Sequence, residues 1–234
     1  MCIVLQFSGG KDSLACLYLL EPRWHEITVA WVNSGAAFPE TIALMDRVRK
    51  MVPHFLEIEG KQNIEAEGYP TDVLPIAATA LGRMYEGHTG MRFQSRYSCC
   101  TAALWGPMVR AMREIGATTI IRGQKRSDVM KTPLQSGTVI EGIRYEFPLE
   151  DWTDADVLAY LRGKGIELPA NYRYMANGLD CINCTAYLHE GKGRLQYMRE
   201  NHPEKHREVQ RVLGALWTTL HEELAPLVGA GSVT

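Results

Sequence analysis

Hydrophobic positions in the first part of the chain alternate between short apolar runs and longer stretches with a helical period. Apolar runs lie at residues 3–7, 26–32 and 54–58, with helical patterns at 12–20 and 39–50 between them. Such short, continuous runs are typical of strands buried on both faces. The alternation of strand and helix predicts an α/β fold, with an open, mostly parallel sheet and helices on both faces.

The alternation resumes after residue 100. Helical patterns and β-rich runs follow one another, with a hairpin or edge strand as the third of four elements, at residues 102–115, 118–121, 139–147 and 153–161. Thr153 is a suitable N-cap for the last of these helices. The intervening segment, residues 61–90, contains several Gly and Pro and is less regular, and we expect it to cover the site.

The sheet pattern stops after Tyr172, and residues 202–227 have the pattern of one or two helices. We therefore predict an α/β domain at residues 1–187 and a helical C-terminal extension at 188–234. Residues 229–234 are expected to fray as a terminal tail.

The junction between the first strand and the first helix has the composition of an anion-binding loop. Two glycines, two serines, a lysine and an aspartate follow the apolar run, as Ser8, Gly9, Gly10, Lys11, Asp12 and Ser13. Glycine lets a ligand approach the main chain closely. The first N–H groups of a helix have no partner within the helix and lie at the positive end of its dipole. The spacing is not that of a Walker A loop. We interpret the loop as a phosphate site of a nucleotide rather than as an ordinary turn with a Ser N-cap.

Two further polar loops leave the carboxyl ends of predicted strands. Asn33, Ser34 and Gly35 follow the second strand, and Gly123, Lys125 and Arg126 follow the strand at 118–121. Since ligands of open parallel sheets bind beyond the carboxyl ends of the strands, all three loops should face one site. Lys125 and Arg126 are interpreted as contacts to phosphate or sulfate rather than as a solvated loop face.

The role of Asp12 remains open between two readings. Its carboxylate, at the helix N-terminus, can interact with the helix dipole, or it can hold Mg²⁺ and orient the loop. The aromatic residues Phe38, Trp152 and Tyr172 are most simply interpreted as members of the core.

Charge and composition restrict the function classes. The 234 residues carry a net charge of −2, so no overall basic field favours nucleic acid as a partner. The apolar runs are shorter than the ~20 residues of a membrane span, and the first strand starts without a preceding signal peptide. We therefore expect a cytoplasmic protein without a membrane partner. A homo-oligomer is compatible with the sequence, which does not determine the oligomeric state.

Four of the six cysteines occur in two pairs, Cys99–Cys100 and Cys181–Cys184. In a reducing compartment, metal binding is a better interpretation than disulfides. Four thiolates are the ligand set of a 4Fe–4S cluster or of structural zinc, and their chemistry alone does not separate the two. Cys2 and Cys16 are expected to be buried apolar fillers.

Several segments, in the same order, resemble the phosphoadenosine and adenosine phosphosulfate reductase family. Ser8–Ser13 resembles the PP-loop of the N-type ATP pyrophosphatases, and Asn33–Thr41 is similar to the family's D-T-G-x-x-F-P-E-T. The other similar segments are Gly123–Ser127, Phe147–Val157, Leu168–Tyr172 and Cys181–Thr185. The resemblance implies an adenine nucleotide alpha hydrolase-like fold, adenosine near residues 33–41, and a 4Fe–4S cluster on Cys99, Cys100, Cys181 and Cys184.

Two departures from the family change the expected chemistry. The reductases carry a nucleophilic Cys in a C-terminal tail, whereas no Cys follows Cys184 here. The family's C-C-x-x-R-K is Cys99-Cys100-Thr101-Ala102-Ala103-Leu104 in this chain, without the basic pair. No catalytic residue is therefore assigned.

Two functional readings follow from this resemblance. In the first, the protein is a sulfonucleotide reductase-like enzyme that binds an adenine phosphosulfate nucleotide and takes its thiol from an external donor. In the second, it is an ATP pyrophosphatase or sulfurtransferase that uses Mg²⁺ and adenylates an acceptor, a nucleic acid or a small molecule, for sulfur transfer. A non-enzymatic nucleotide-binding regulator is the third reading.

Overall fold

The computed structural model describes residues 2–129, 131–179 and 181–228. The chain divides into two compact units. The first comprises residues 1–60 and 104–180, and the second comprises residues 61–103 and 181–234. In the second unit, a segment from the middle of the chain packs with the C-terminal helices. The division predicted between residues 187 and 188 stays a prediction.

The first unit is built around a six-stranded sheet with the order β3-β2-β1-β6-β8-β7. All neighbours are parallel except β7 and β8, which pair antiparallel at one edge. The strands are β1 (Ile3–Gln6), β2 (Ile27–Asn33), β3 (Phe55–Glu59), β6 (Thr119–Ile121), β7 (Val139–Ile140) and β8 (Ile143–Glu146). The predicted α/β fold with an open, mostly parallel sheet is confirmed, as is the edge hairpin.

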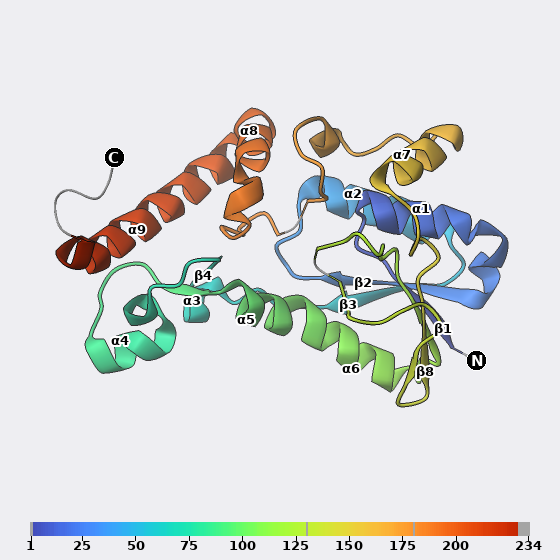
Figure 1. Ribbon diagram of the computed structural model, residues 1–234, viewed down its shortest axis with the longest axis horizontal. Coiled ribbons are helices and arrows are strands. Elements are labelled where there is room, and N and C mark those ends of the chain that lie inside the picture. Colours follow the sequence, from blue (N-terminus) through green and yellow to red (C-terminus); the bar gives the residue numbers. More distant parts are fainter. Residues whose placement is uncertain (1, 130, 180, 229–234) are drawn as a thin grey trace. The chain divides into compact units, whose positions relative to one another are not determined.

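The helices of the first unit cover both faces of this sheet (Figure 1). They are α1 (Lys11–Leu19), α2 (Pro39–Met51), α6 (Gly106–Glu114) and α7 (Asp154–Gly163), with 3-10 turns at Glu21–Glu26 and Ala170–Arg173. Apolar residues of α1, α2 and α7 form one core with Leu5 and Ile121. Ala111 and Met112 of α6 form a second core with Val4 and Ile120 on the opposite face. Alternate residues of each strand thus serve opposite cores.

Local sequence explains where several of these elements begin and turn. Thr153 caps α7 in a capping box with Asp156, as predicted for the N-cap. The β7–β8 hairpin turns at Glu141 and Gly142, both with positive φ, as a two-residue turn matching the twist of the strands requires. Pro39 occupies the first position of α2, where its missing N–H costs nothing.

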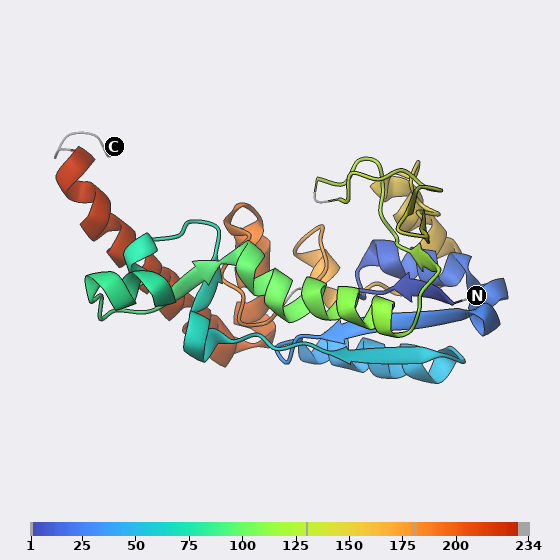
Figure 2. The ribbon, with the colours of Figure 1, turned by 90° about the horizontal axis from the view of Figure 1, so that it is seen from below.

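The second unit combines a two-stranded parallel sheet with helices. It contains β4 (Tyr69–Thr71), β5 (Phe93–Ser95), α3 (Ile64–Glu67), α4 (Ala80–Glu86), α5 (Arg96–Cys100), α8 (Gly191–Asn201), α9 (Pro203–Val228) and 3-10 turns at Ile76–Ala78 and Leu188–Glu190. Figure 2 shows β5 running directly into α5, which is followed by a π-helical turn, Thr101–Trp105. Phe93, Val212 and Leu216 are buried together in its core.

The sequence predicted one or two helices in the C-terminal part of the second unit. The structure has a single long helix, α9, preceded by α8. The predicted fraying at 229–234 lies outside the described residues. Whether residues 61–90 cover the site stays a prediction. Among the residues that the structure describes, no helix is both long and apolar enough to cross a membrane.

A close backbone approach fixes the position of α1 against the strand-end loop of β6. A Cβ atom on Gly123 would lie 2.6 Å from the carbonyl oxygen of Asp12 and 3.0 Å from the amide nitrogen of Ser13. Both are main-chain atoms of the first turn of α1 and cannot rotate away. Glycine is therefore required at position 123 by space.

We predict that Gly123→Ala lowers the free energy of unfolding by about 1–3 kcal/mol, as overpacking against a rigid backbone does. Gly163→Ala is the matched control, because a Cβ atom there meets nothing within 4 Å and the residue ends helix α7. The control should be neutral or stabilising by up to about 1 kcal/mol. Urea denaturation of both variants measures the difference, and equal stabilities would contradict the assignment.

Candidate functional site

The predicted anion loop lies between the end of β1 and the first turn of α1. Gly9 has φ +83°, a conformation that other residues rarely adopt, and Gly10 is the N-cap of α1 without any side-chain cap. The helix therefore begins with main-chain groups at the positive end of its dipole. A site for a negatively charged group is the chemistry that this arrangement supports.

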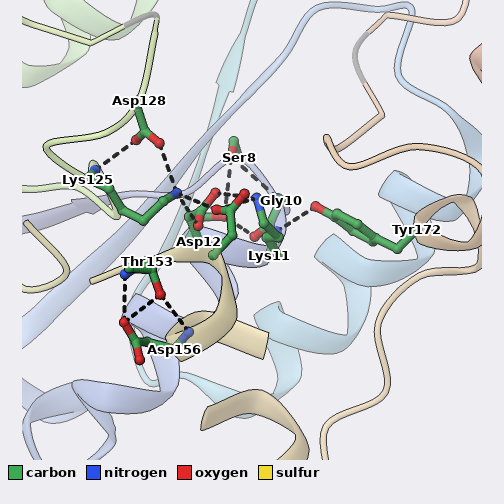
Figure 3. Close-up of polar contacts among 11 residues, drawn as sticks. Ser8, Gly10, Lys11, Asp12, Lys125, Asp128, Thr153, Asp156 and Tyr172 are labelled. Atoms are coloured by element: carbon green, nitrogen blue, oxygen red, sulfur yellow. Dashed lines mark hydrogen bonds and ion pairs between the residues drawn. The ribbon is translucent and has the colours of Figure 1, made fainter. Parts of the chain in front are cut away.

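Side chains of the loop are arranged around these main-chain groups. The Ser8 hydroxyl accepts from the Gly10 N–H at 3.4 Å and donates to the Ser13 hydroxyl at 3.2 Å, and Ser13 donates to the Gly10 carbonyl at 2.9 Å. The Lys11 N–H donates to the Tyr172 hydroxyl at 2.7 Å (Figure 3). The interpretation of Tyr172 as a core aromatic is therefore incomplete, since its hydroxyl reaches the loop.

A small pocket adjoins the loop. Its walls come from the loop, from the start of α2 and from the segment after Pro169, and they consist of Ser8, Gly9, Glu40, Thr41, Leu44, Pro169, Asn171, Tyr172, Gly178 and Leu179. Gly178 approaches the loop closely, because a Cβ atom there would lie 3.3 Å from the Cα of Gly10. The sequence motif at 33–41 thus reaches the loop through Glu40 and Thr41, which agree with the family's motif but were not among the predicted nucleotide-binding residues.

Lys125 comes to the loop, as predicted, but its ammonium group contacts carboxylates. The Nζ atom lies 2.6 Å from Asp12, 2.9 Å from Asp128 and 3.3 Å from Asp154 (Figure 3 shows the first two), and the side chain is 2% exposed. Burial alone would lower the pKa of Lys125, but hydrogen bonds to Asp12 and Asp128 raise it above its ordinary value. The ammonium therefore stays charged.

Lys11 belongs to the same ionic cluster. Its Nζ atom lies 3.2 Å from Asp12 and 3.3 Å from Asp154. Burial acts to raise the pKa of the Asp154 carboxyl, but the ammonium groups of Lys11 and Lys125 together lower it below its ordinary value. Asp12 thus serves as a carboxylate partner of two lysines, which is compatible with its predicted role in orienting the loop. Its interaction with the helix dipole and its binding of Mg²⁺ stay predictions.

Arg126 lies apart from this cluster. Its guanidinium is exposed and pairs with the exposed carboxylate of Asp151 at 2.7 Å. The prediction that Lys125 and Arg126 contact phosphate or sulfate stays a prediction, and in the structure both cations face carboxylates.

The loop after β2 holds its own shape with its polar side chains. The Gly35 N–H donates to the Asn33 Oδ1 at 3.0 Å, and the Asn33 amide donates to Glu57 at 2.9 Å. Ser34 is buried and accepts from the Ala36 N–H at 3.3 Å. Gly35 has φ +74°, which explains glycine at this turn. Their predicted contact with a nucleotide stays a prediction.

All four paired cysteines belong to the second unit. Cys99 and Cys184 are buried, whereas Cys100 and Cys181 are half-buried. The Cys184 N–H donates to the Cys181 carbonyl at 3.0 Å, which closes the C-x-x-C turn. Burial raises the pKa of the Cys99 thiol, and a hydrogen bond from Gln62 acts in the opposite direction.

Arg96 connects the segments that carry the two cysteine pairs. It precedes Cys99 by one helical turn, and its guanidinium lies over the Tyr97 and Tyr187 rings at 4.9 and 4.5 Å. Asp72 pairs with Arg96 at 3.2 Å and accepts from the Leu188 N–H at 3.1 Å. Across the described ranges, however, no three His, Cys, Asp or Glu side chains are arranged to hold a metal ion. The predicted metal centre thus stays a prediction.

Comparisons with known proteins cover most of the chain. The family model described as the phosphoadenosine phosphosulfate reductase domain matches residues 2–187. The adenosine 5'-phosphosulfate reductase of Burkholderia cepacia is 30% identical over 166 residues, which are 69% of this chain and 60% of that protein. The chain thus matches somewhat less than two thirds of this relative's length.

Two solved structures resemble the fold at low identity. A phosphoadenylyl-sulfate reductase from Candida auris, in a phosphate complex, has a TM-score of 0.49 at 17% identity and covers 72% of this chain and 75% of its own. The U34-tRNA thiolase NcsA of Methanococcus maripaludis, with its 4Fe–4S cluster, has a TM-score of 0.46 at 15% identity. The match covers 94% of this chain and 72% of the thiolase chain.

We predict that Lys125→Met lowers the free energy of unfolding by about 2 kcal/mol. This is less than the roughly 3–5 kcal/mol lost when a fully buried pair is broken, because the three carboxylates are partly exposed. Chemical denaturation at pH 7 measures the loss. Arg126→Met is the control, since it removes an exposed cation, and its denaturation midpoint should stay near that of the wild type.

The loss in the free energy of unfolding caused by Lys125→Met should become smaller in acid. The pKa of Asp154 is lowered in the folded state, so its stabilising contribution is present above its ordinary value of 3.8 and disappears as the pH falls through the lowered value. The gap between wild type and Lys125→Met should therefore narrow below about pH 4. A gap that does not change with pH would contradict the ionic origin.

Proposed function

Because the chain belongs to the phosphoadenosine phosphosulfate reductase domain family, we propose that its first unit binds an adenine nucleotide with the phosphate group at Ser8–Ser13. The observation that carries the proposal is the first turn of α1. It begins at glycines without a side-chain cap, beside the hydroxyls of Ser8 and Ser13. Main-chain N–H groups at a helix N-terminus bind phosphate or sulfate oxygens, and the adenosine would extend toward residues 33–35.

The lysines of the site have a supporting role in this proposal. Lys11 and Lys125 already contact carboxylates, so they fix the loop and the start of α7. The anion would then be held by main-chain N–H groups and by hydroxyls that turn away from their present acceptors in the loop. These donors carry no charge that needs a partner. Mg²⁺ with ATP belongs to the alternative reading below.

We propose a sulfonucleotide reductase-like reaction with an external thiol. In this reaction a thiolate attacks the sulfur, the bond from sulfur to the phosphate oxygen breaks, and the nucleoside phosphate leaves. A second thiol then attacks the resulting thiosulfonate, releasing sulfite and forming a disulfide. Cys16 is unsuited, because it is fully buried and burial raises its pKa to about 12. Cys2 is half-buried at the first strand and packs against the second core. The thiol would therefore come from a donor protein or a small molecule.

The lack of a suitable thiol in Cys2 and Cys16 is equally consistent with the second proposed function, adenylation of an acceptor. An enzyme without a suitable thiol of its own can instead use ATP and Mg²⁺ to adenylate an acceptor, a nucleic acid or a small molecule, with release of pyrophosphate. In both readings the loop holds the anionic part of an adenine nucleotide, and the two differ in the bond that breaks.

We further propose that the four paired cysteines hold a 4Fe–4S cluster. The chemistry of the donor set fits, because four thiols lie in one compact unit and two of them share a hydrogen-bonded turn. The Arg96 and Asp72 contacts support the approach of the two segments. When bound, such a cluster supplies a one-electron couple and iron atoms with affinity for sulfur.

We predict that Gly10→Ala weakens binding of adenosine 5'-phosphosulfate or ATP·Mg²⁺ at least 10-fold while the protein stays folded. An added Cβ atom would lie 3.6 Å from Ser8 and Tyr172, an ordinary contact, but beside the main-chain donors. Ser8→Ala should weaken binding by about 1 kcal/mol, a factor of about 5. Calorimetric titration measures both, with Gly163→Ala as the control. Unchanged affinity in both loop variants would exclude the site.

Turnover separates the two readings. Anaerobically purified protein receives adenosine 5'-phosphosulfate and a thiol in one assay and ATP·Mg²⁺ in another. Sulfite release supports the reductase-like reaction, and pyrophosphate release without sulfite supports adenylation. Release of neither product, with nucleotide bound, would leave the regulator as the remaining reading.

For the cysteine centre, we predict a brown protein after anaerobic purification, with about four iron and four sulfide per chain. Cys181→Ser and Cys184→Ser should lose most of this iron because each removes a thiolate ligand, whereas Cys2→Ser should keep it. Iron and sulfide analysis with absorption spectra measures the effect. A colourless protein containing zinc would contradict the cluster and leave the four-thiolate site.

A further inference from the structure

Two polar side chains lie side by side where β1 and β6 end. The parallel register pairs Leu5 with Ile121, so the next residues, Gln6 and Arg122, are neighbours across the strands. The Arg122 Nε donates to the Gln6 Oε1 at 2.5 Å. A guanidinium has no acceptor, so the amide must turn its oxygen toward it. The Gln6 amide nitrogen and the remaining guanidinium nitrogens are therefore N–H donors.

These donors lie on the face of the sheet opposite α1. Leu5 and Ile121 pack in the core with α1, whereas Val4 and Ile120 pack in the core with α6. Alternation along the strands puts Gln6 and Arg122 on the α6 side. Gln6 precedes Ser8 by two residues, a distance of about 7 Å along an extended chain. One nucleotide can therefore reach both this donor pair and the anion loop.

Arg122 differs from the other cations near the loop because it has no acidic partner. Lys11, Lys125 and Arg126 each contact a carboxylate. For Arg122, no Asp or Glu of the described part of the chain lies within ion-pair distance. Its side chain is half-buried, and the titratable group that affects its pKa is the Tyr145 hydroxyl of β8, which is neutral near pH 7.

Burial without a counter-charge has a cost that a bound anion removes. Burial lowers the pKa of the Arg122 guanidinium, with Tyr145 acting in the opposite direction. Taking a cation partly out of water is unfavourable unless an anion accompanies it. The planar fork of arginine matches the oxygens of phosphate and sulfate, and an amide N–H beside it adds a further donor.

We infer that Gln6 and Arg122 form a second oxyanion site that binds a phosphate or sulfate group of the nucleotide held at the anion loop. The inference rests on the proposed nucleotide binding and adds which residues contact a second anionic group of that nucleotide. It assigns a specificity role to Arg122, since a nucleotide with one anionic group would leave this site empty.

The test compares three ligands on wild type, Arg122→Met and Arg144→Met by calorimetric titration. The ligands are adenosine 5'-phosphate, adenosine 3',5'-bisphosphate and adenosine 5'-phosphosulfate. Arg144 is the matched control because it is an exposed arginine of the neighbouring strand β8, and it too has no acidic partner among the described residues. Each variant removes one positive charge, so a long-range effect of charge would appear in both.

We expect Arg122→Met to lose at least 10-fold in affinity for the bisphosphate or the phosphosulfate and less than 2-fold for the 5'-phosphate. The ligand that loses affinity identifies the group that is bound. The melting temperature of Arg122→Met should stay equal or rise. Equal losses for all three ligands, no loss relative to Arg144→Met, or a marked fall in melting temperature would overturn the inference.

A separate measurement keeps the two proposals distinguishable. If wild type binds none of the nucleotides, the proposed function fails. A sulfate titration then decides the oxyanion site by itself. A rise in the melting temperature of wild type and Arg144→Met, but not of Arg122→Met, would support the site, and equal rises in all three would overturn it.

Discussion

The ion pairs of the buried Lys125 ammonium group hold together the loops after β1 and β6 and the start of α7 in the first unit. The ammonium group joins Asp12 of the first helix, Asp128 of its own loop and Asp154 of α7. A buried charge without partners is costly, so the fold is stable only when these three segments meet. Lys11 adds a second ammonium to Asp12 and Asp154. The cluster thus has two positive and three negative groups, and the lysines are occupied by structure.

Because the lysines pair with carboxylates, other polar groups must supply the hydrogen bonds to a ligand. Lys125, which the sequence assigns to phosphate, instead holds the loop and the start of α7 together, whereas Arg126 pairs with Asp151 on the surface. Main-chain N–H groups of the first turn of α1 and the Gln6–Arg122 pair are left as donors, because the Ser8 and Ser13 hydroxyls already donate within the loop. Donors of this kind recognise an anion by direction as well as by charge, because each hydrogen bond fixes the position of one oxygen. If the proposed site binds an anion, we expect it to favour tetrahedral phosphate and sulfate groups over simple anions.

Sequence pattern was sufficient for the sheet, its edge hairpin, the cap at Thr153 and the glycine-rich turn from β1 to α1, because each depends on neighbours in the chain. It was insufficient where distant residues meet. The position of Lys125 after β6 was predictable, but its contact with Asp12, 113 residues away, depends on the packing of α1 against Gly123. Tyr172 looked like a core aromatic because its ring is apolar, and its hydroxyl contact with Lys11 has no local signal. Segment 61–103 packs with 181–234, a pairing that no periodicity reports.

The hydrogen bond from the Lys11 N–H to the Tyr172 hydroxyl has a consequence for kinetics and affinity. If an anion binds at this N–H, it must first displace the phenol, which then acts as an internal competitor. The apparent affinity would be the intrinsic affinity multiplied by the fraction of molecules in which the phenol has left. Removing the Tyr172 hydroxyl would abolish this competition and raise the apparent affinity, but it would also expose the start of α1 to water. Displacement of the phenol would also release the segment around Asn171 and Gly178. The rate of amide hydrogen exchange in this segment would then report whether an anion occupies the loop.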